Sequence, residues 1–274
     1  MFDNDVRPES VPKRVFEFCR IVSQEEISID DIRNKIFPED LNVGINNSYF
    51  NYIMGAAEEL KLIEKTESKS LIYVGDKNHV KNLHSFRRYC NSVVWKNENT
   101  RFYKIAHAFL DSELDWISKG SFSQSPEILG LVRKSMNDAD SDLQRHILGE
   151  RFWLSFLGFG YIYSSNNVYN FLPNMYIALK DFIVLSDIEK NKEITMNDFV
   201  TVIYKNFTIG LKDAFSSKSF NYAFSSALRQ LHDNKEIVLK RISDSKEIWN
   251  LYPMGTHEFV KEITHITIRE GINK

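Results

Sequence analysis

The sequence predicts a mainly helical α+β fold with short β-hairpins. Two observations carry this prediction. Helical hydrophobic periodicity recurs along the chain, and it is repeatedly followed by two β-rich segments around a polar turn. The hairpin-like segment at 159–173 also returns in part, because IWNLYP at 248–253 matches VYNFLP at 168–173. We therefore predict tandem winged-helix-like modules, each ending in helix, strand, turn and strand.

Composition limits the classes of protein that fit. The 274 residues leave room for one large domain or for two to three small modules. The 35 basic and 37 acidic residues give a net charge of −2, so any surface that binds nucleic acid must be local. Cys19 and Cys90 lack metal or redox spacing and are expected to be buried in a protein of a reducing compartment. No segment approaches the roughly 18 apolar residues that cross a membrane, so we expect a soluble, cytoplasmic protein.

The first module is predicted to span residues 1–76, with three helices and a hairpin. Pro12 occupies a first helical position, Ser28 caps a second helix, and a cluster of asparagines begins a third. Two short β segments around a polar turn follow between Glu64 and Val74. The third helix holds the recognition position of a helix-turn-helix.

Three segments of this module resemble a known family. They are VPKRVFEFCRIV, EISIDDIRNKIFPEDL and FNYIMGAAEELKLIEK. They are similar to the N-terminal winged helix of the DpdG family. Members of this family are accessory proteins of bacterial 7-deazaguanine DNA-modification and restriction systems. The resemblance covers about 75 of 274 residues and rests mostly on core positions. It implies a non-enzymatic component of a DNA-modification or phage-defence system, and it assigns no functional residue.

The charge of the first module opposes a simple DNA-reading role. Residues 1–75 hold 9 Lys or Arg and 14 Asp or Glu, a net charge of −5, whereas cations supply most non-specific affinity for duplex DNA. The outer face of the third helix is expected to show Ser48, Asn51, Tyr52 and Gly55. These residues could touch base edges, or they could form an ordinary polar or protein-binding face.

Residues 77–187 are predicted to form a basic helical connector followed by a second winged-helix-like module. Between 77 and 107, seven basic residues stand against one acid, Glu98, a local charge of +6, with five aromatic residues interleaved. Such a mixture can neutralise phosphates and stack on bases. Alternatively, the cations pair with the acidic first module and the aromatics pack on neighbouring modules. The basic residues are Lys77, Lys81, Arg87, Arg88, Lys96, Arg101 and Lys104.

The second module itself is expected to be structural or to bind protein. Asp138, Asp140 and Asp142 crowd the start of its last helix and would repel phosphate there. Its hairpin at 159–173 contains no Lys or Arg. The predicted DNA contacts therefore lie in the connector and the third module.

The third module is predicted to span residues 188–274. Its helix at 217–231 is expected to turn an acid-free face outward, and its wing at 237–252 carries two adjacent cations suited to phosphate contact. The alternative is a solvated polar face beside a wing of mixed charge. The alternating segment at 263–268 has no assigned role. The predicted contacts are Lys218, Asn221, Tyr222 and Arg229 on the helix, with Lys240 and Arg241 on the wing.

No pattern in the sequence predicts catalysis or a cofactor. Phosphate-binding loops, dinucleotide-binding glycines, zinc-protease helices, nucleophile elbows and Cys/His fingers are absent. His257, Glu258 and His265 are too widely spaced to predict a metal site. The acidic cluster at 111–115 lacks the strand and catalytic lysine of a nuclease. We therefore expect a protein that is not an enzyme.

These observations predict a DNA-binding accessory protein that contacts duplex or single-stranded DNA through the connector and the third module. One alternative is a scaffold that holds partner subunits of a multi-protein complex, with the acidic first module against a basic partner. Another is a stand-alone transcription regulator, which would form a homodimer and bind a palindromic site.

Overall fold

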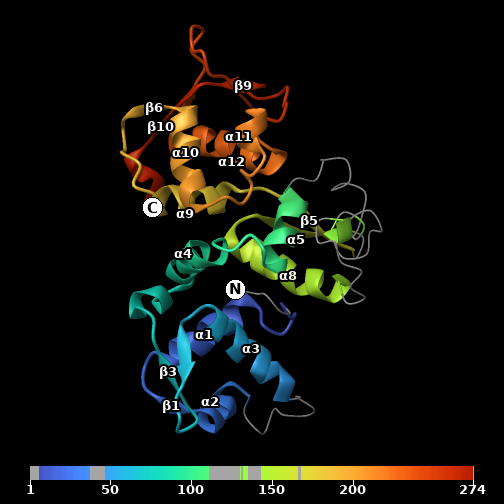
Figure 1. Ribbon diagram of the computed structural model, residues 1–274, viewed down its shortest axis with the longest axis vertical. Helices are drawn as coiled ribbons and strands as arrows, with labels where there is room; N and C mark the ends of the chain where they lie inside the picture. Colours follow the sequence, from blue (N-terminus) through green and yellow to red (C-terminus); the bar gives the residue numbers. More distant parts are fainter. Residues whose placement is uncertain are drawn as a thin grey trace.

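The computed structural model describes residues 6–37, 47–110, 130, 132–134, 143–165 and 168–273. Within these ranges the chain is a mixed α and β protein with small antiparallel sheets, which confirms the predicted class. Figure 1 shows two lobes, formed by the N-terminal and C-terminal parts of the chain, with the middle part between them. The acidic cluster at 111–115 and the aspartates at 138–142 lie outside the described residues.

The N-terminal unit contains three helices and a three-stranded antiparallel sheet. Its elements are α1 (Pro12–Val22), β1 (Ile27–Ser28), α2 (Ile29–Ile36), α3 (Asn47–Glu59), β2 (Ile63–Lys65) and β3 (Ser70–Tyr73). α1 begins with a proline, which suits the first turn of a helix. Ser28 caps α2, because its hydroxyl accepts a hydrogen bond from the Asp31 backbone at 3.1 Å. β3 lies between β1 and β2. The two strands of the predicted hairpin, β2 and β3, therefore belong to a three-stranded sheet that β1 completes.

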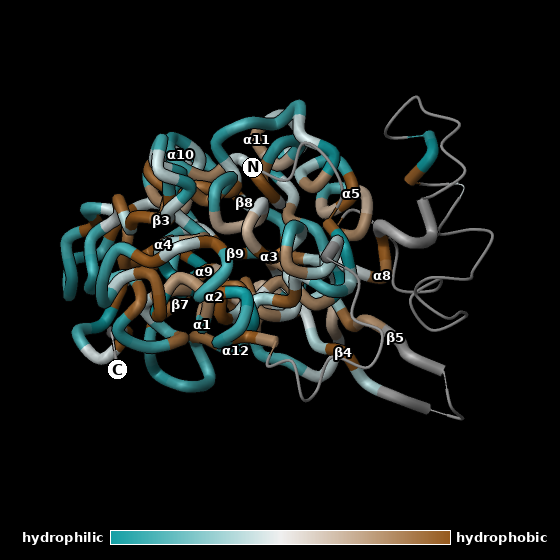
Figure 2. The backbone as a smooth tube through the Cα atoms, turned by 90° about the horizontal axis from the view of Figure 1, so that it is seen from below, coloured by the Kyte–Doolittle hydropathy of each residue, from teal (hydrophilic) through white to brown (hydrophobic). Residues whose placement is uncertain are grey.

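The core of this unit is the apolar stripe predicted for its first helix. Val15, Phe18, Cys19 and Val22 of α1 are all buried. The ring of Phe18 lies 5.8 Å from that of Phe50 on α3. Removing a buried ring of this kind costs about 3 to 5 kcal/mol, so this contact strongly favours the packing of α1 on α3. Figure 2 shows that hydrophilic segments of the chain lie mostly at the periphery.

The middle part joins the two units through helices and a two-stranded hairpin. Its elements are η2 (Lys77–Val80), α4 (Leu83–Val94), α5 (Arg101–Leu110), α8 (Leu143–Leu157), β4 (Gly160–Ser165) and β5 (Val168–Pro173). The hairpin predicted at 159–173 is confirmed, with Gly160 opposite Pro173. α8 ends before Gly158, whose φ of 87° favours glycine. Within the described residues β4 and β5 pair only with each other, so this part lacks the three-stranded sheet of the N-terminal unit.

The C-terminal unit contains helices around a second three-stranded antiparallel sheet. Its elements are α9 (Tyr176–Leu185), β6 (Glu193–Thr195), α10 (Met196–Asn206), α11 (Ala214–Ser217), α12 (Tyr222–Asp233), β7 (Ile237–Lys240), β8 (Trp249–Asn250), β9 (Glu262–Ile263), β10 (His265–Ile268) and η3 (Glu270–Asn273). α9 packs against α12 and also against α4; we describe it with the C-terminal unit, and the boundary at residue 188 stays a prediction. The helix predicted from residue 217 begins at Tyr222, because Lys218 is left-handed and Asn221 caps α12 by accepting from the Phe224 backbone at 2.9 Å.

The two units repeat one order of elements. α1, β1, α2, α3, β2 and β3 correspond to α9, β6, α10, α12, β7 and β10, and in both sheets the last strand lies in the middle. Thr195 caps α10 by accepting from the Asp198 backbone at 3.0 Å, as Ser28 caps α2. α3 and α12 are each followed by a lysine with positive φ, Lys61 and Lys235. The C-terminal unit is therefore a second copy of the N-terminal arrangement.

The repeat predicted between 168–173 and 248–253 is wrong. β8, within the second segment, pairs with β9 inside an insertion that separates β7 from β10. β7 pairs instead with β10, which lies in the alternating segment at 263–268 to which the sequence assigned no role. The reason is burial, because Ile266 and Ile268 of β10 are fully buried opposite β7 and complete the apolar face of the sheet.

Candidate nucleic-acid interface

The two adjacent arginines of the connector face an internal carboxylate. Asp181 on α9 is 1% exposed, and it accepts hydrogen bonds from Arg87 Nε at 2.8 Å and Arg87 Nη2 at 3.2 Å. Arg88 Nε lies 3.5 Å from the same carboxylate. A carboxylate out of water requires such partners. Arg87 and Arg88 therefore join α4 to α9, and DNA contact by these two arginines stays a prediction.

The network around Asp181 extends into the middle part. Buried Asn91 donates from Nδ2 to Asp181 at 2.9 Å and to the carbonyl of Leu157 at 3.0 Å, and its Oδ1 accepts from Trp95 Nε1 at 3.1 Å. His84 contacts both arginines of α4. Burial, and then the two neighbouring cations, lower the pKa of His84. Asn91 thus links α8 to the buried carboxylate that joins α4 and α9.

Arg229 on α12 is buried under the insertion between β7 and β10. Its Nη2 donates to the carbonyls of Tyr252 at 2.7 Å and Val260 at 3.0 Å, and its Nε donates to the carbonyl of Phe259 at 3.0 Å. Only 2% of Arg229 is exposed. The outward position predicted for Arg229 is wrong, because the chain itself covers this face of the helix.

The other residues predicted on this helix also have local structural roles. Lys218 Nζ donates to a side-chain oxygen on α10 at 2.6 Å and lies 4.6 Å from the centroid of the Trp249 ring. Asn221 is the cap of α12. Tyr222 packs edge-on against Tyr252. These contacts hold Lys218, Asn221 and Tyr222 half-buried against their own unit.

The two cations of the predicted wing form surface ion pairs. Lys240 pairs with Glu193, and Arg241 Nε lies 3.0 Å from Glu262. Exposed pairs of this kind contribute at most about 1 kcal/mol, so a phosphate can compete for the cation. Each acid nevertheless cancels one positive charge, so Lys240 and Arg241 lie on the surface without forming a positive patch.

Four predicted lysines have no acidic partner among the described residues: Lys77, Lys81, Lys96 and Lys104. The first three are exposed and the fourth is half-buried. Lys77 and Lys81 lie at η2, before α4, whereas Lys96 follows α4. Lys104 lies on α5. Arg101, also on α5, is half-buried and interacts with another residue. The surface cations of the connector are therefore fewer than the sequence indicates.

A polar pocket of about 270 Å³ opens beside Lys104. Glu98 in its wall forms an ion pair with Lys212 at 3.2 Å. A hydrogen bond from Thr208, and then one from Lys212, lower the pKa of Glu98. Because Lys212 already neutralises this acid, Lys104 gives the pocket a net positive charge.

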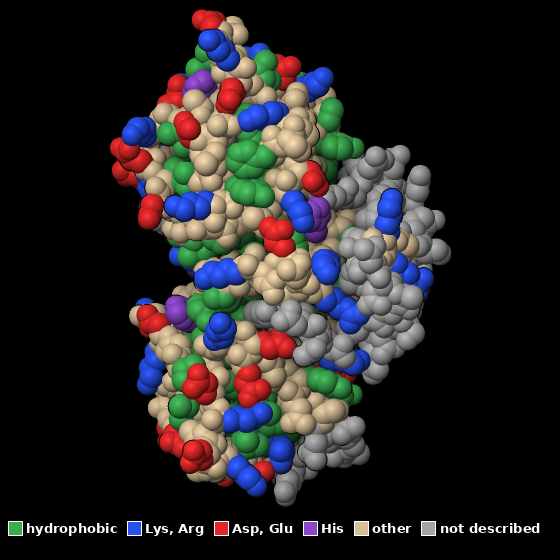
Figure 3. All heavy atoms as spheres, viewed as in Figure 1, with side chains coloured by type: hydrophobic (Ala, Val, Ile, Leu, Met, Phe, Trp, Pro, Cys, Tyr) green, Lys and Arg blue, Asp and Glu red, His purple; other side chains and the backbone are tan. Residues whose placement is uncertain are grey.

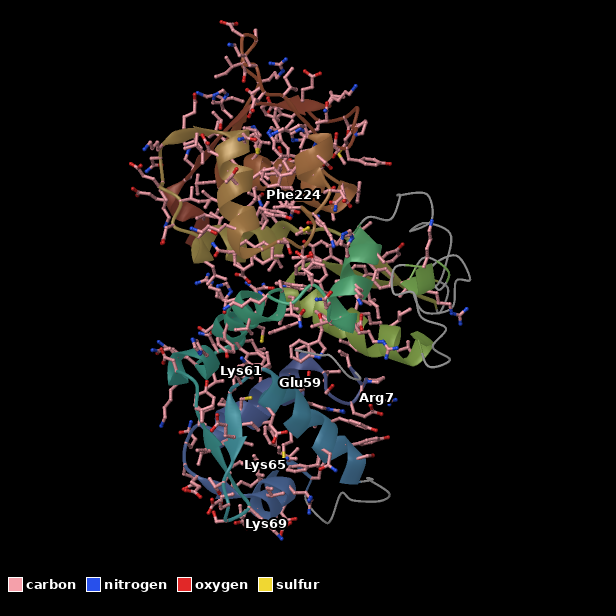
Figure 4. The ribbon with its side chains drawn as sticks, in the orientation of Figure 1. Arg7, Glu59, Lys61, Lys65, Lys69 and Phe224 are labelled. Carbon is pink, nitrogen blue, oxygen red and sulfur yellow. The ribbon has the colours of Figure 1, made fainter. Side chains whose placement is uncertain are left out.

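A second group of lysines, which are not among the predicted contacts, lies on and just before the β2–β3 hairpin. Figure 4 shows Lys61, Lys65 and Lys69 along this side of the N-terminal unit. Lys65 pairs with Glu58 at 2.9 Å, whereas Lys61 and Lys69 are exposed and have no ion pair among the described residues. The spacing of these lysines around a hairpin was a readable signal, but the negative charge of the whole module concealed it.

Positive and negative side chains both occur near the middle of the molecule. On the face drawn in Figure 3, Lys and Arg side chains are mixed with Asp and Glu on both lobes, and several lie along the waist between the lobes. This waist is where the connector passes between the two units.

The residues weighed as metal ligands have other partners. His257 Nε2 lies 3.0 Å from Asp233, and Glu258 lies 2.9 Å from His232 Nε2. No group of three or more His, Cys, Asp or Glu in the described ranges is placed to hold a metal ion.

Cys19 and Cys90 are free and buried, as predicted. No helix in the described part of the chain is long and apolar enough to cross a membrane.

No protein-family model, curated protein or solved structure matches this chain.

Proposed function

We propose that the chain is a non-enzymatic DNA-binding accessory protein whose two repeated units are winged-helix modules. The order helix, strand, helix, helix, strand, strand, with the last strand in the middle of the sheet, supports this assignment for both units. The resemblance of the first 75 residues to the DpdG family supports a place in a bacterial DNA-modification or phage-defence system, in the cytoplasm. Because one fold serves many functions, surface charge must decide how such modules are used.

The four lysines of the connector without acidic partners carry this proposal. Lys77 and Lys81 precede α4 and Lys96 follows it, with Lys104 on the next helix. α4 has 12 residues, so at about 1.5 Å per residue its ends lie about 18 Å apart. Lysines at both ends can therefore neutralise phosphates several base pairs apart on one duplex. Contacts of this kind position DNA without reading its sequence.

Fluorescence anisotropy with a labelled DNA duplex at several salt concentrations tests the proposal. The unchanged protein should bind in a salt-dependent manner. The variant Lys77→Glu, Lys81→Glu, Lys96→Glu, Lys104→Glu should bind at least about tenfold more weakly to every sequence, because phosphate neutralisation supplies the affinity. The slope of log K against log salt should fall by about 0.9 for each phosphate that the variant no longer neutralises.

A matched control changes four exposed lysines elsewhere, Lys13, Lys205, Lys246 and Lys261, to Glu. It alters the net charge by the same amount and should retain most of the affinity. An equal loss in both variants would assign the binding to overall charge and not to the connector. Absence of salt-dependent binding by the unchanged protein near physiological ionic strength would refute the proposal.

A protein-interaction scaffold is the second candidate. Two observations favour it: the covered outer face of α12, and the lack of any Lys or Arg on α3 in a module of net charge −5. Neither helix then offers the basic face that suits the major groove. A stable complex with a partner subunit, in which all DNA affinity resides in the partner, would support this candidate over direct DNA binding.

A further inference from the structure

His84 on α4 lies between two guanidinium groups. Arg87 Nη2 lies 3.0 Å from its Nδ1, and Arg88 Nη2 lies 2.7 Å from its Nε2. Burial, and then the two arginines, lower the pKa of His84, so its ring is neutral near pH 7. A neutral imidazole has one acceptor nitrogen and one N–H, whereas every N–H of an arginine is a donor. His84 can therefore accept a hydrogen bond from only one of the two arginines, and the other contact sets one N–H against another.

Asp181 does not supply the acceptor that the second arginine lacks. Its oxygens accept from Arg87 Nε at 2.8 Å, from Arg87 Nη2 at 3.2 Å and from Asn91 Nδ2 at 2.9 Å. Arg88 Nε is 3.5 Å from this carboxylate and forms no hydrogen bond with it. This Nε is buried, and no hydrogen-bond partner for it exists among the described residues. Since a buried N–H without an acceptor destabilises the fold, the site has more donors than acceptors.

The charges at this site do not balance either. In the part of the chain that the structure describes, Asp181 is the one acid within ion-pair distance of Arg87 or Arg88. Lys180, its neighbour in the sequence, is already neutralised by Glu236. One carboxylate faces two guanidinium groups, so one positive charge is left without a partner.

This positive charge can be reached from water. His84 is exposed, and the side chains of Arg87 and Arg88 are 17% and 27% exposed. The three residues lie in the first two turns of α4, where the helix dipole favours anions. η2 packs against α4 and carries Lys77 and Lys81 to the same end of the helix. Rotation of the His84 side chain into solvent would open the space between the two guanidinium groups.

We propose that Arg87 and Arg88 bind a phosphate group in the place of the His84 ring. A phosphate accepts at each of its oxygens, so it can accept from both guanidinium groups where the imidazole accepts from one. It also supplies the negative charge that the site lacks. Adjacent residues of a helix point about 100° apart, so the two guanidinium groups approach from different directions, which suits a tetrahedral phosphate better than a planar carboxylate. The phosphate belongs either to the DNA backbone or to a small phosphate ester.

Thermal unfolding of the full chain in inorganic phosphate tests this inference, with chloride at the same ionic strength as the reference. The Tm should rise saturably, by about 3 °C when phosphate is at about ten times its Kd. His84→Glu places a carboxylate between the guanidinium groups, so it should raise the Tm without phosphate and abolish the phosphate effect. His84→Ala removes the competing ring and should retain the effect. Thr256→Glu, the same charge change on an exposed residue of the C-terminal unit, should also retain it.

Three results would overturn the inference. The first is the absence of a phosphate-specific rise in the Tm of the unchanged chain and of His84→Ala. The second is an equal rise in His84→Glu, which would reflect the general stabilising effect of phosphate salts. The third is an equal rise in acetate, which would show that the site does not distinguish phosphate from carboxylate.

Two further measurements distinguish the sources of the phosphate. If it belongs to DNA, His84→Glu should weaken duplex binding about fivefold and Thr256→Glu should not. If it belongs to a small ester, a deoxynucleoside monophosphate should stabilise the chain at lower concentration than inorganic phosphate, and His84→Glu should leave duplex binding unchanged. The DNA measurement rests on the proposed function, whereas the phosphate titration does not. A phosphate effect without DNA binding would therefore refute the proposed function alone, and DNA binding without a phosphate effect would refute this inference alone.

Discussion

A single buried carboxylate, Asp181, holds α4 of the connector against α9 of the C-terminal unit. Two arginines and Asn91 surround it with hydrogen bonds and charge. Separating such a group from its partners leaves charge in a medium that solvates it poorly. The Asp181 network therefore favours the packing of α4 on α9.

Replacing Asp181 with Ala leaves Arg87 and Arg88 without their partner. The free energy of unfolding should fall by about 3 to 5 kcal/mol, the usual cost of breaking a buried pair. Urea denaturation followed by circular dichroism measures this change. Glu17→Ala, which breaks an exposed pair with Arg20, is the control and should have little effect. Equal losses of stability in the two variants would contradict the structural role of Asp181.

Glu150 predicts a dependence of stability on pH. Burial raises the pKa of Glu150 well above its usual value, and Arg101 offsets this only in part. The folded state therefore favours the neutral acid, and stability is lost as the pH rises from the unfolded-state pKa, about 4.3, towards the raised folded-state pKa. Glu150→Gln should raise the Tm at neutral and higher pH and change it little below about pH 4. A thermal unfolding series over pH would contradict this if the difference in Tm were constant.

At the scale of secondary-structure elements, the two units differ mainly in one connection. Their helices begin at the same kind of cap and their sheets have the same strand order. The insertion after β7 adds β8, β9 and residues 251–261, which cover one face of α12 and bury Arg229. A change in loop length has thus given two copies of one unit different surfaces.

The helix caps Ser28 and Thr195 are expected to contribute equally to the free energy of unfolding. Ser28→Ala and Thr195→Ala each remove a hydroxyl that accepts from a backbone N–H in the first turn of a helix. Each should lower the free energy of unfolding by about 1 kcal/mol. Denaturation of the two single variants measures this. A neutral Thr195→Ala beside a destabilising Ser28→Ala would contradict the equivalence of α2 and α10.

At the scale of the whole molecule, the middle part lies between two similar units. α4 contacts α9 through the Asp181 network and contacts the N-terminal unit through Phe86, whose ring lies 5.5 Å from that of Phe16. Tyr89 adds a hydrogen bond to the Leu60 carbonyl at 2.7 Å. Polar contacts on one side of α4 and mostly apolar contacts on the other therefore set the arrangement of the lobes.

This arrangement predicts that a polar substitution loosens the lobes without unfolding them. Spin labels at Lys69→Cys and Lys246→Cys, two exposed turn positions, report the distance between the units, and the buried native cysteines should not react. The distance distribution should be narrow in the otherwise unchanged protein and broader with Asp181→Asn, which removes the charge that the arginines face. An unchanged distribution would show that apolar contacts alone set the arrangement.

Features that arise from neighbouring residues were readable from the sequence. Helix starts at Pro12 and Ser28, the stripe on α1 and the hairpin at 159–173 were all predicted, because caps, periodicity and turns are decided within a few residues. The surface lysines of the connector belong to the same class, since a lysine without a nearby acid stays in water at little cost.

Features that depend on remote partners required the folded chain. The buried roles of Arg87 and Arg229, the pairing of β7 with β10, and the cover over α12 all join residues that are distant in the sequence. An arginine looks the same in sequence whether it meets a phosphate or a carbonyl of its own chain. Which of these it meets depends on the apolar burial that brings distant segments together.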